Sequence, residues 1–179
     1  EDPCIFFKKD RSLILALFVD DGLMAVRDKA ILDEFLAKLR HEFEVKVGEA
    51  DTYLGLEIHR SIDGSIFVNQ KAYCEKVLKR FRMDSSNPVS TPFEQTGQKV
   101  GEVLEENVPY REAVGSLLFL AMVTRPDISF VTGFLSRFLS KPLKEHWALV
   151  KRVLQYLNGT RDYGILYKNN YKQGLLECY

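Results

Sequence analysis

The sequence predicts an α+β fold, in which an antiparallel sheet with a covering helix is followed by a mostly helical region. Over the first seventy residues, short apolar runs alternate with turn signals, a pattern typical of strands. From Gln70 onward, apolar residues recur at three- and four-residue spacing, which indicates helices. The proline-containing stretch at residues 87–92 breaks the helical pattern and predicts an extended linker.

The first strands are predicted at residues 5–8, 13–19 and 23–26. A polar connection at residues 9–12 suits a hairpin, and Asp20 and Asp21, followed by glycine, suit a tight turn. Asp28 can cap a helix over residues 29–43, whose apolar residues form one stripe. We therefore expect this helix to lie across the sheet.

The remaining elements follow from turn signals and from periodicity. Asp63 and Gly64 predict a hairpin between two further strands. Those strands are expected at residues 53–58 and 65–68, helices at 71–82, 110–123, 127–139 and 144–157, and a strand pair at 163–167 and 175–179. Pro126 fits the first turn of its helix, and Asn158 with Gly159 should stop the last one.

Composition argues against several classes of protein. With 25 basic and 25 acidic residues, the formal net charge is zero, unlike a protein that binds nucleic acid through bulk positive charge. The longest apolar run, residues 13–19, is far shorter than the roughly 20 residues of a membrane helix, so no membrane partner is expected. Three distant cysteines predict neither a disulfide framework nor a zinc ribbon, which favours an intracellular setting. The non-Met start, without a signal peptide, is interpreted as a cut edge.

The segment from Phe18 to Asp21 carries the most informative chemistry. Two adjacent carboxylates at a hairpin tip repel each other unless a cation lies beside them. Hard cations such as Mg²⁺ take oxygen ligands, and two of them can activate a 3′-hydroxyl and hold the leaving pyrophosphate in nucleotidyl transfer. The alternative is an ordinary turn, which Asp-Asp-Gly favours for conformational reasons alone.

Eight short motifs occur in a fixed order along nearly the whole chain. They are Asp-Pro-Cys at residues 2–4, Phe-Val-Asp-Asp at 18–21, Gly-Glu-Ala at 48–50, Tyr-Leu-Gly-Leu-Glu-Ile at 53–58, Pro-Val-Ser-Thr-Pro at 88–92, Val-Gly-Ser-Leu at 114–117, Thr-Arg-Pro-Asp-Ile at 124–128 and Lys-Glu-His-Trp at 144–147. The series resembles the reverse transcriptase domain of copia-type LTR retrotransposon Pol polyproteins. Each motif alone is weak, whereas their collinear order is highly specific.

The resemblance implies roles for particular residues. Asp20 and Asp21 match the pair that holds catalytic Mg²⁺, or Mn²⁺ in its place, in a reverse transcriptase palm. A segment that resembles the primer grip, which orients the end of the growing strand, comprises Leu54, Gly55, Leu56 and Glu57. Phosphate contacts are expected from Lys76, Lys79, Arg80, Lys151 and Arg152. The alternatives are a plain sheet hairpin and solvated helix faces.

By the same resemblance, residues 1–70 would be a partial palm, 71–162 a helical thumb and connection, and 163–179 a strand pair leading toward ribonuclease H. Expected partners are an RNA template, an RNA–DNA hybrid, deoxynucleotides, and the fingers, ribonuclease H and integrase domains of Pol, in a cytoplasmic virus-like particle. The fingers and a third palm carboxylate are not found in the sequence, so we expect the isolated chain not to extend a primer.

Two other interpretations stay open. A decayed or co-opted fragment would act only as a non-catalytic nucleic-acid-binding or interaction module, and the intact aspartate pair argues against decay. An unrelated metal-dependent phosphotransfer enzyme would need further acids near Asp20, and the strands before it offer only Asp2 and Asp10.

Some conspicuous residues are interpreted as structural. Trp147 lies on the apolar face of its predicted helix and is expected in the core. Asp127 is explained by favourable placement in a first helical turn. The three histidines, His41, His59 and His146, form no metal-ligand cluster.

Overall fold

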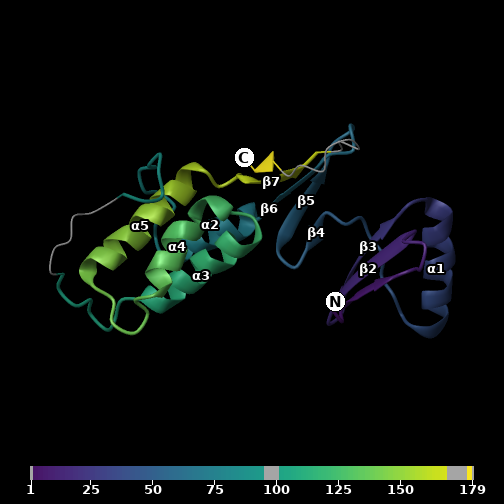
Figure 1. Ribbon diagram of the computed structural model, residues 1–179, viewed down its shortest axis with the longest axis horizontal. Helices are drawn as coiled ribbons and strands as arrows, with labels where there is room; N and C mark the ends of the chain where they lie inside the picture. Colours follow the sequence, from purple (N-terminus) through teal and green to yellow (C-terminus); the bar gives the residue numbers. More distant parts are fainter. Residues whose placement is uncertain (1, 95–100, 169–176, 179) are drawn as a thin grey trace. The chain divides into compact units, whose positions relative to one another are not determined.

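The computed structural model describes residues 2–94, 101–168 and 177–178 (Figure 1). The chain forms two compact units, Glu1–Leu54 and Gly55–Tyr179, which are described in turn. The described residues form two antiparallel sheets and five α-helices, so the predicted α+β class is confirmed. Within these residues, every helix is too short or too polar to cross a lipid bilayer.

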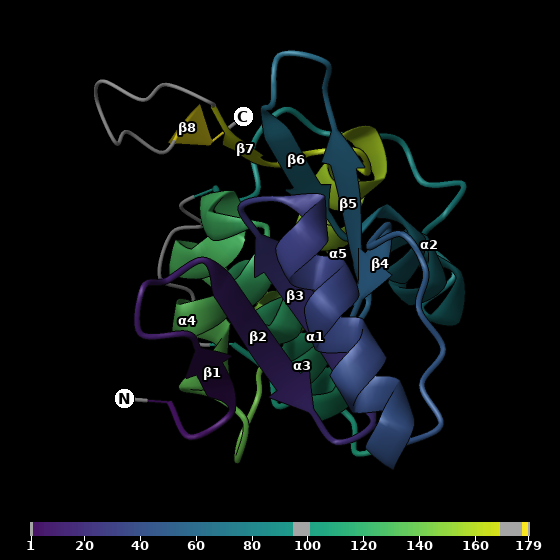
Figure 2. The same ribbon diagram turned by 90° about the vertical axis from the view of Figure 1, so that its right-hand side faces the viewer.

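The first unit is a three-stranded antiparallel sheet with one helix. Its sheet has the predicted order β1 (Ile5–Phe7), β2 (Leu13–Phe18), β3 (Asp21–Val26). The second turn was predicted at Asp20 and Asp21, but it lies at Val19 and Asp20, because Asp21 and Gly22 already pair with β2. Helix α1 (Lys29–Glu42) begins as expected, because Asp28 Oδ1 accepts a hydrogen bond from Ile31 N at 3.1 Å. Figure 2 shows α1 lying across the sheet. The short strand β4 (Thr52–Tyr53) comes at the end of this unit.

One face of this sheet is apolar and exposed. Directly paired residues share a face, and the pairs Ile5 with Ala16 and Phe7 with Ile14 lie on the same face as Phe18. Ile5, Phe7, Ile14 and Phe18 are all exposed. Leu13 lies on the opposite face and is buried. Among the described residues of the unit, only Leu13 and Leu36 of α1 have buried apolar side chains. Most of the other residues in the predicted apolar stripe of the helix are therefore only half-buried.

Within the second unit, the strands of the other sheet run in the order β5 (Leu56–Arg60), β6 (Ile66–Asn69), β7 (Gly164–Tyr167), β8 (Glu177–Cys178). The β5–β6 hairpin turns as predicted, with Asp63 Oδ1 accepting from Ser65 N at 2.9 Å and Gly64 at φ +82°. The tail strands β7 and β8 pair with each other as predicted, and their connecting residues lie outside the described ranges. The pairing of β7 with β6 was not predicted; Gly164 permits it, because an added Cβ would lie 2.3 Å from the Val68 carbonyl oxygen.

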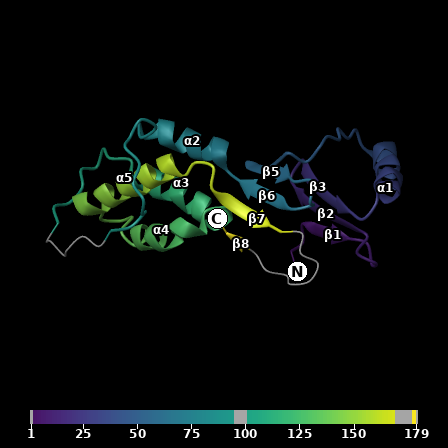
Figure 3. The same ribbon diagram turned by 90° about the horizontal axis from the view of Figure 1, so that it is seen from above.

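The helices of the second unit pack into one bundle around a continuous apolar core (Figure 3). They are α2 (Lys71–Arg80), α3 (Tyr110–Val123), the 3₁₀ helix η1 (Pro126–Ile128), α4 (Ser129–Ser136) and α5 (Lys144–Gly159). The helix predicted at residues 127–139 is thus a short 3₁₀ turn followed by a shorter α-helix. Leu78, Leu117, Leu135 and Leu154 are fully buried and come from four different helices.

The end of α5 corrects one prediction. The helix continues through Asn158 and Gly159, which were expected to stop it. Asn158 Nδ2 instead donates to Ser86 O at 2.6 Å, and a Cβ added at Gly159 would lie 2.9 Å from Pro88 Cβ. The glycine is therefore needed for close packing of the linker against α5, not for a helix-ending turn.

A buried arginine ties the end of α3, η1, the end of α5 and the start of β7 together. Arg125 is only 2% exposed. Its Nη2 lies 2.7 Å from Asp127 Oδ2, and its Nη1 donates to Thr160 O at 2.7 Å. The rings of Tyr156 and Tyr163 lie 5.5 Å and 5.4 Å from the guanidinium carbon. Asp127 lies in the first turn, as predicted, but its larger role is to neutralise Arg125.

His146, and not only Trp147, packs in the core. Trp147 is half-buried against the core, whereas His146 is 5% exposed. The His146 Nδ1 atom accepts a hydrogen bond from Leu143 N at 3.0 Å, and its ring stacks on Phe138 with centroids 3.9 Å apart. His146 therefore caps α5, a structural role consistent with the absence of a histidine cluster in the sequence.

The stability of the chain is expected to fall in mild acid because of His146. Burial lowers the pKa of His146, so the unfolded chain takes up a proton at higher pH than the folded chain. Stability is therefore complete above the ordinary histidine pKa of about 6.5 and declines as pH falls toward the folded pKa. Urea unfolding between about pH 7 and pH 5 should show a larger loss for wild type than for His146→Gln, whose amide oxygen can still accept the Leu143 bond. An equal loss in both would contradict this.

Candidate active site

The two aspartates lie at the tip of the β2–β3 hairpin. Phe18, the last residue of β2, pairs with Asp21, the first residue of β3, so that Val19 and Asp20 form a two-residue connection. Both aspartates are exposed. Among the residues that the structure describes, neither carboxylate has a hydrogen-bond or ion-pair partner. The hairpin therefore holds two adjacent carboxylates open to solvent.

The turn itself is strained. Val19 has φ +52° and a side chain that is 79% exposed. Positive φ at the first of two connecting residues is the place where type II′ turns favour glycine, and a β-branched residue there costs about 1–3 kcal/mol. The six residue pairs of the β2–β3 ladder hold this conformation in place. The strained residue thus lies directly before the aspartates.

Val19→Gly is expected to stabilise the first unit by about 1 kcal/mol, because relief of strain exceeds the added entropy of the unfolded chain. Hydrogen exchange of the β2–β3 amides measures this change. Ala25→Gly is the matched control, since Ala25 is an exposed residue of β3 without positive φ, and it should destabilise by about 0.5–1 kcal/mol. If Val19→Gly lost as much hydrogen-exchange protection as Ala25→Gly, the inference that Val19 is strained would be refuted.

The oxygen atoms of Asp20 and Asp21 are of the kind that Mg²⁺ prefers, but they make an incomplete set of ligands. Within the described ranges, no three His, Cys, Asp or Glu residues are grouped so that they could hold a metal ion. Asp2 Oδ1 accepts from Cys4 N at 2.9 Å, and Asp10 Oδ1 accepts from Ser12 N at 3.1 Å. The bonds from Ser12 lower the pKa of Asp10. The chain could therefore supply a cation with two adjacent carboxylate ligands. The remaining coordination positions of the cation would be filled by water or by other groups.

The primer-grip-like segment contains a tight turn, not the predicted continuous strand. Leu54 and Gly55 have φ +50° and +82°, between β4 and β5. Positive φ at both residues is the pattern of a type I′ turn, which explains the glycine. A Cβ added at Gly55 would meet nothing within 4 Å, so the backbone there is accessible. Leu56 is half-buried in β5, and Glu57 Oε1 accepts a hydrogen bond from Ala72 N at 2.6 Å.

The predicted phosphate-binding residues fall into two groups. Lys76, Lys79 and Lys151 are exposed and have no ion-pair partner among the described residues. Arg80 Nη2 lies 2.6 Å from Glu112 Oε2, and Arg152 Nη1 lies 2.7 Å from Glu94 Oε2. The two arginines are therefore engaged in ion pairs, whereas the lysines are exposed to solvent. The sequence did not predict these ion pairs, because Glu112 and Glu94 lie far from the two arginines in the chain.

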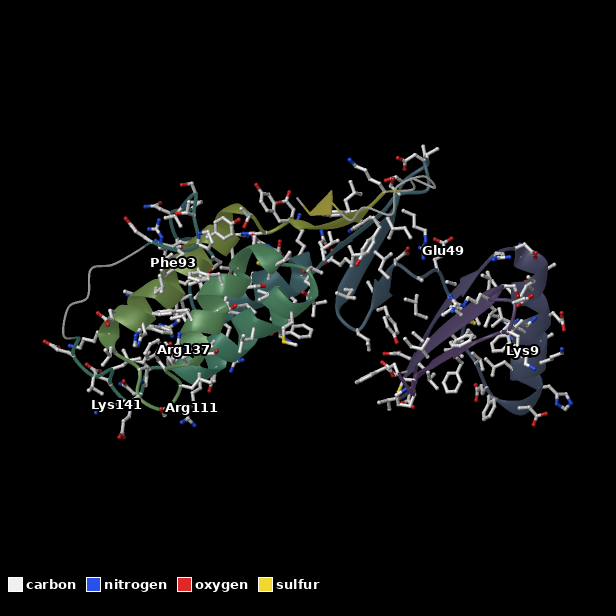
Figure 4. The ribbon with its side chains drawn as sticks, in the orientation of Figure 1. Lys9, Glu49, Phe93, Arg111, Arg137 and Lys141 are labelled. Atoms are coloured by element: carbon white, nitrogen blue, oxygen red, sulfur yellow. The ribbon has the colours of Figure 1, made fainter. Side chains whose placement is uncertain are left out.

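Another basic group was not predicted. Figure 4 shows Arg111, Arg137 and Lys141 at the same end of the helical unit. Arg111 Nε donates to Leu139 O at 3.0 Å. Arg111 and Lys141 line a cleft of about 500 Å³, but Glu105 and Glu106 line it as well. Because its charges are mixed, this cleft has no clear preference for an anion or a cation.

Comparison with known proteins identifies the family. Residues 3–95 match the family model described as reverse transcriptase (RNA-dependent DNA polymerase). The chain is 39% identical over 173 residues to the Retrovirus-related Pol polyprotein from transposon TNT 1-94 of Nicotiana tabacum, covering 89% of this chain and 13% of that protein. It is 38% identical over 174 residues to the Retrovirus-related Pol polyprotein from transposon RE2 of Arabidopsis thaliana, covering 93% of this chain and 12% of that protein.

A putative transposon Ty5-1 protein of Saccharomyces cerevisiae is 33% identical over 168 residues, covering 89% of this chain and 53% of that protein. No solved structure matches the chain. The chain spans about an eighth of the length of the tobacco and Arabidopsis polyproteins. The resemblance seen in the sequence is confirmed: the chain belongs to the reverse transcriptase (RNA-dependent DNA polymerase) family found in retrotransposon Pol polyproteins.

Proposed function

We propose that this chain supplies part of the palm, together with the thumb and connection, of a retrotransposon RNA-directed DNA polymerase. The observation that carries the proposal is the β2–β3 turn, which presents Asp20 and Asp21 to solvent without a competing partner among the described residues. Family membership supports the same reaction class, a nucleotidyl transfer. Residues 1–70 take the palm role, 71–162 the thumb and connection, and 163–179 lead toward ribonuclease H.

Asp20 and Asp21 would hold Mg²⁺, for which Mn²⁺ can substitute. When bound, the ions supply activation of the primer 3′-hydroxyl and stabilisation of the leaving pyrophosphate. The protein's part is to keep two negative groups adjacent and hydrated, so that their mutual repulsion favours cation binding. The hairpin ladder fixes both residues at one end of the sheet, which limits the reorganisation needed when a cation binds.

Nucleic acid would be held by the second unit and by the turn at its beginning. The turn at Leu54 and Gly55 would orient the primer end through its accessible backbone. Lys76, Lys79 and Lys151 would contact phosphates of an RNA–DNA hybrid, because such duplexes are recognised mainly through their backbone. The proposed partners are accordingly an RNA template, the hybrid, deoxynucleotides, and the fingers, ribonuclease H and integrase domains of Pol, in a cytoplasmic virus-like particle.

Paramagnetic broadening by Mn²⁺ tests the metal site without requiring synthesis. In spectra of the 179-residue chain, Mn²⁺ should broaden the amide signals of residues 19–22 first. The double variant Asp20→Asn with Asp21→Asn should abolish this broadening, since asparagine side chains have the shape of aspartate side chains but carry no charge. Asp10→Asn is the matched control, an exposed acid in another turn of the same unit, and should leave the broadening unchanged. Equal broadening in the double variant would refute the proposed metal site.

A further inference from the structure

Helix α2 lacks a capping side chain of its own. Its N-cap residue, Gln70, makes no side-chain capping bond, and its first turn contains no acidic residue. The first hydrogen bond within the helix runs from Cys74 N to Gln70 O at 2.8 Å. The amides of the first turn are therefore left to water or to an acceptor from another element.

The side chain of Gln70 is committed elsewhere. Gln70 is 2% exposed, and its Oε1 accepts a hydrogen bond from Thr124 Oγ1, at the end of α3, at 2.9 Å. The residue before it, Asn69, is also buried and ends strand β6. This junction between strand and helix is thus packed tightly against α3, and its own polar side chains do not cap the helix.

Glu57 supplies the missing acceptor from strand β5. Its Oε1 lies 2.6 Å from Ala72 N, the amide of the second residue of α2. Its backbone pairs with Asn69, directly before the N-cap. Glu57 is therefore connected to the start of α2 through both its backbone partner and its side chain. A negative charge at this end also interacts favourably with the helix dipole.

We infer that Glu57 is a positioning residue, whose carboxylate couples the Leu54–Gly55 turn to the start of the basic helix α2. The turn ends two residues before Glu57, and the exposed Lys76 and Lys79 lie farther along the helix that Glu57 caps. Glu57 would act through the Ala72 amide and not by touching nucleic acid. The importance of this coupling for primer placement rests on the proposed function, but the coupling itself is measurable without nucleic acid.

Amide hydrogen exchange on the 179-residue chain tests the coupling, with Glu57→Ala and Glu57→Gln as the informative pair. In Glu57→Ala, protection should fall roughly five- to tenfold at Ala72 and also in the β5–β6 ladder. Glu57→Gln should retain most of it, because its amide oxygen can accept the same bond. Glu75→Ala, which removes a carboxylate from the middle of α2, is the control and should leave both regions unchanged.

Three results would overturn the inference: unchanged protection in Glu57→Ala, a loss at Ala72 without a change in the β5–β6 ladder, or equal losses in Glu57→Gln and Glu57→Ala. A second measurement, the affinity for a short RNA–DNA hybrid, should fall severalfold in Glu57→Ala and recover in Glu57→Gln. If the wild-type chain binds no hybrid, the proposed function fails, while hydrogen exchange still decides whether the coupling exists.

Discussion

Asp127→Ala is expected to lower the free energy of unfolding of the second unit by about 3 kcal/mol, the lower end of the range for a broken buried ion pair, because the Asp127 side chain is 32% exposed. The substitution removes a carboxylate that lies 2.7 Å from Arg125 Nη2 and accepts from Tyr156 Oη at 2.8 Å. Arg125 is 2% exposed, and its remaining hydrogen-bond acceptors in the described residues are the uncharged oxygens of Thr160. A buried positive charge would thus lose its compensating partner. Urea unfolding at fixed pH measures the loss.

Two further variants show whether charge is the cause. Asp162→Ala removes an exposed acid close in sequence to Thr160 and should change stability by less than about 0.5 kcal/mol. Arg125→Met combined with Asp127→Leu should be less damaging than Asp127→Ala alone, because it leaves no uncompensated charge. A loss below about 1 kcal/mol for Asp127→Ala would show that solvent, and not Asp127, balances Arg125.

Asp20→Asn with Asp21→Asn is expected to abolish DNA synthesis by a polymerase that contains this segment. The segment can be exchanged for the corresponding 173 residues of the tobacco Pol polyprotein, to which it is 39% identical. Loss of metal-assisted charge stabilisation is worth several kcal/mol, so extension of a primed RNA template with Mg²⁺ should fall by about a thousandfold or more. Single-turnover primer extension measures the effect.

The matched control for synthesis is again Asp10→Asn, which should retain activity. The isolated 179-residue chain should extend no primer, whether residues 20 and 21 are the wild-type aspartates or the substituted asparagines. Incorporation by the isolated wild-type chain above the level of the double variant would show that no third carboxylate is required. Continued synthesis by the exchanged double variant would favour the alternative of a non-catalytic module.

Local signals in the sequence predicted most of the elements correctly. Asp28 caps α1, and Asp63 with Gly64 turns the β5–β6 hairpin, because both signals act over two or three residues. The pairing of β7 with β6 and the burial of Arg125 were missed, since both depend on elements far apart in the chain. The continuation of α5 through Gly159 was missed for the same reason, because it reflects packing against Pro88.

The candidate site was predictable to a similar extent. The sequence indicated a hairpin with Asp20 and Asp21 in its turn, and the hairpin is present, but its connection is Val19 and Asp20 while Asp21 begins β3. It gave no sign of the positive φ at Val19, a conformation that β-branched residues rarely adopt. It also could not show that Arg80 and Arg152 pair with Glu112 and Glu94, or that Glu57 caps a helix fifteen residues later. Contacts of this kind arise only once the chain has folded.

The apolar face of the first sheet has a practical consequence for handling the chain. Phe7, Ile14 and Phe18 meet water there, and within the described residues β3 has a neighbouring strand on one edge only. Exposed apolar sheet faces and unpaired strand edges promote self-association in water. Light scattering over a dilution series should therefore show particles that grow with protein concentration. Exchanging Phe7 and Ile14 for threonine would keep strand propensity while adding hydroxyl groups, which makes the chain better suited to spectroscopy.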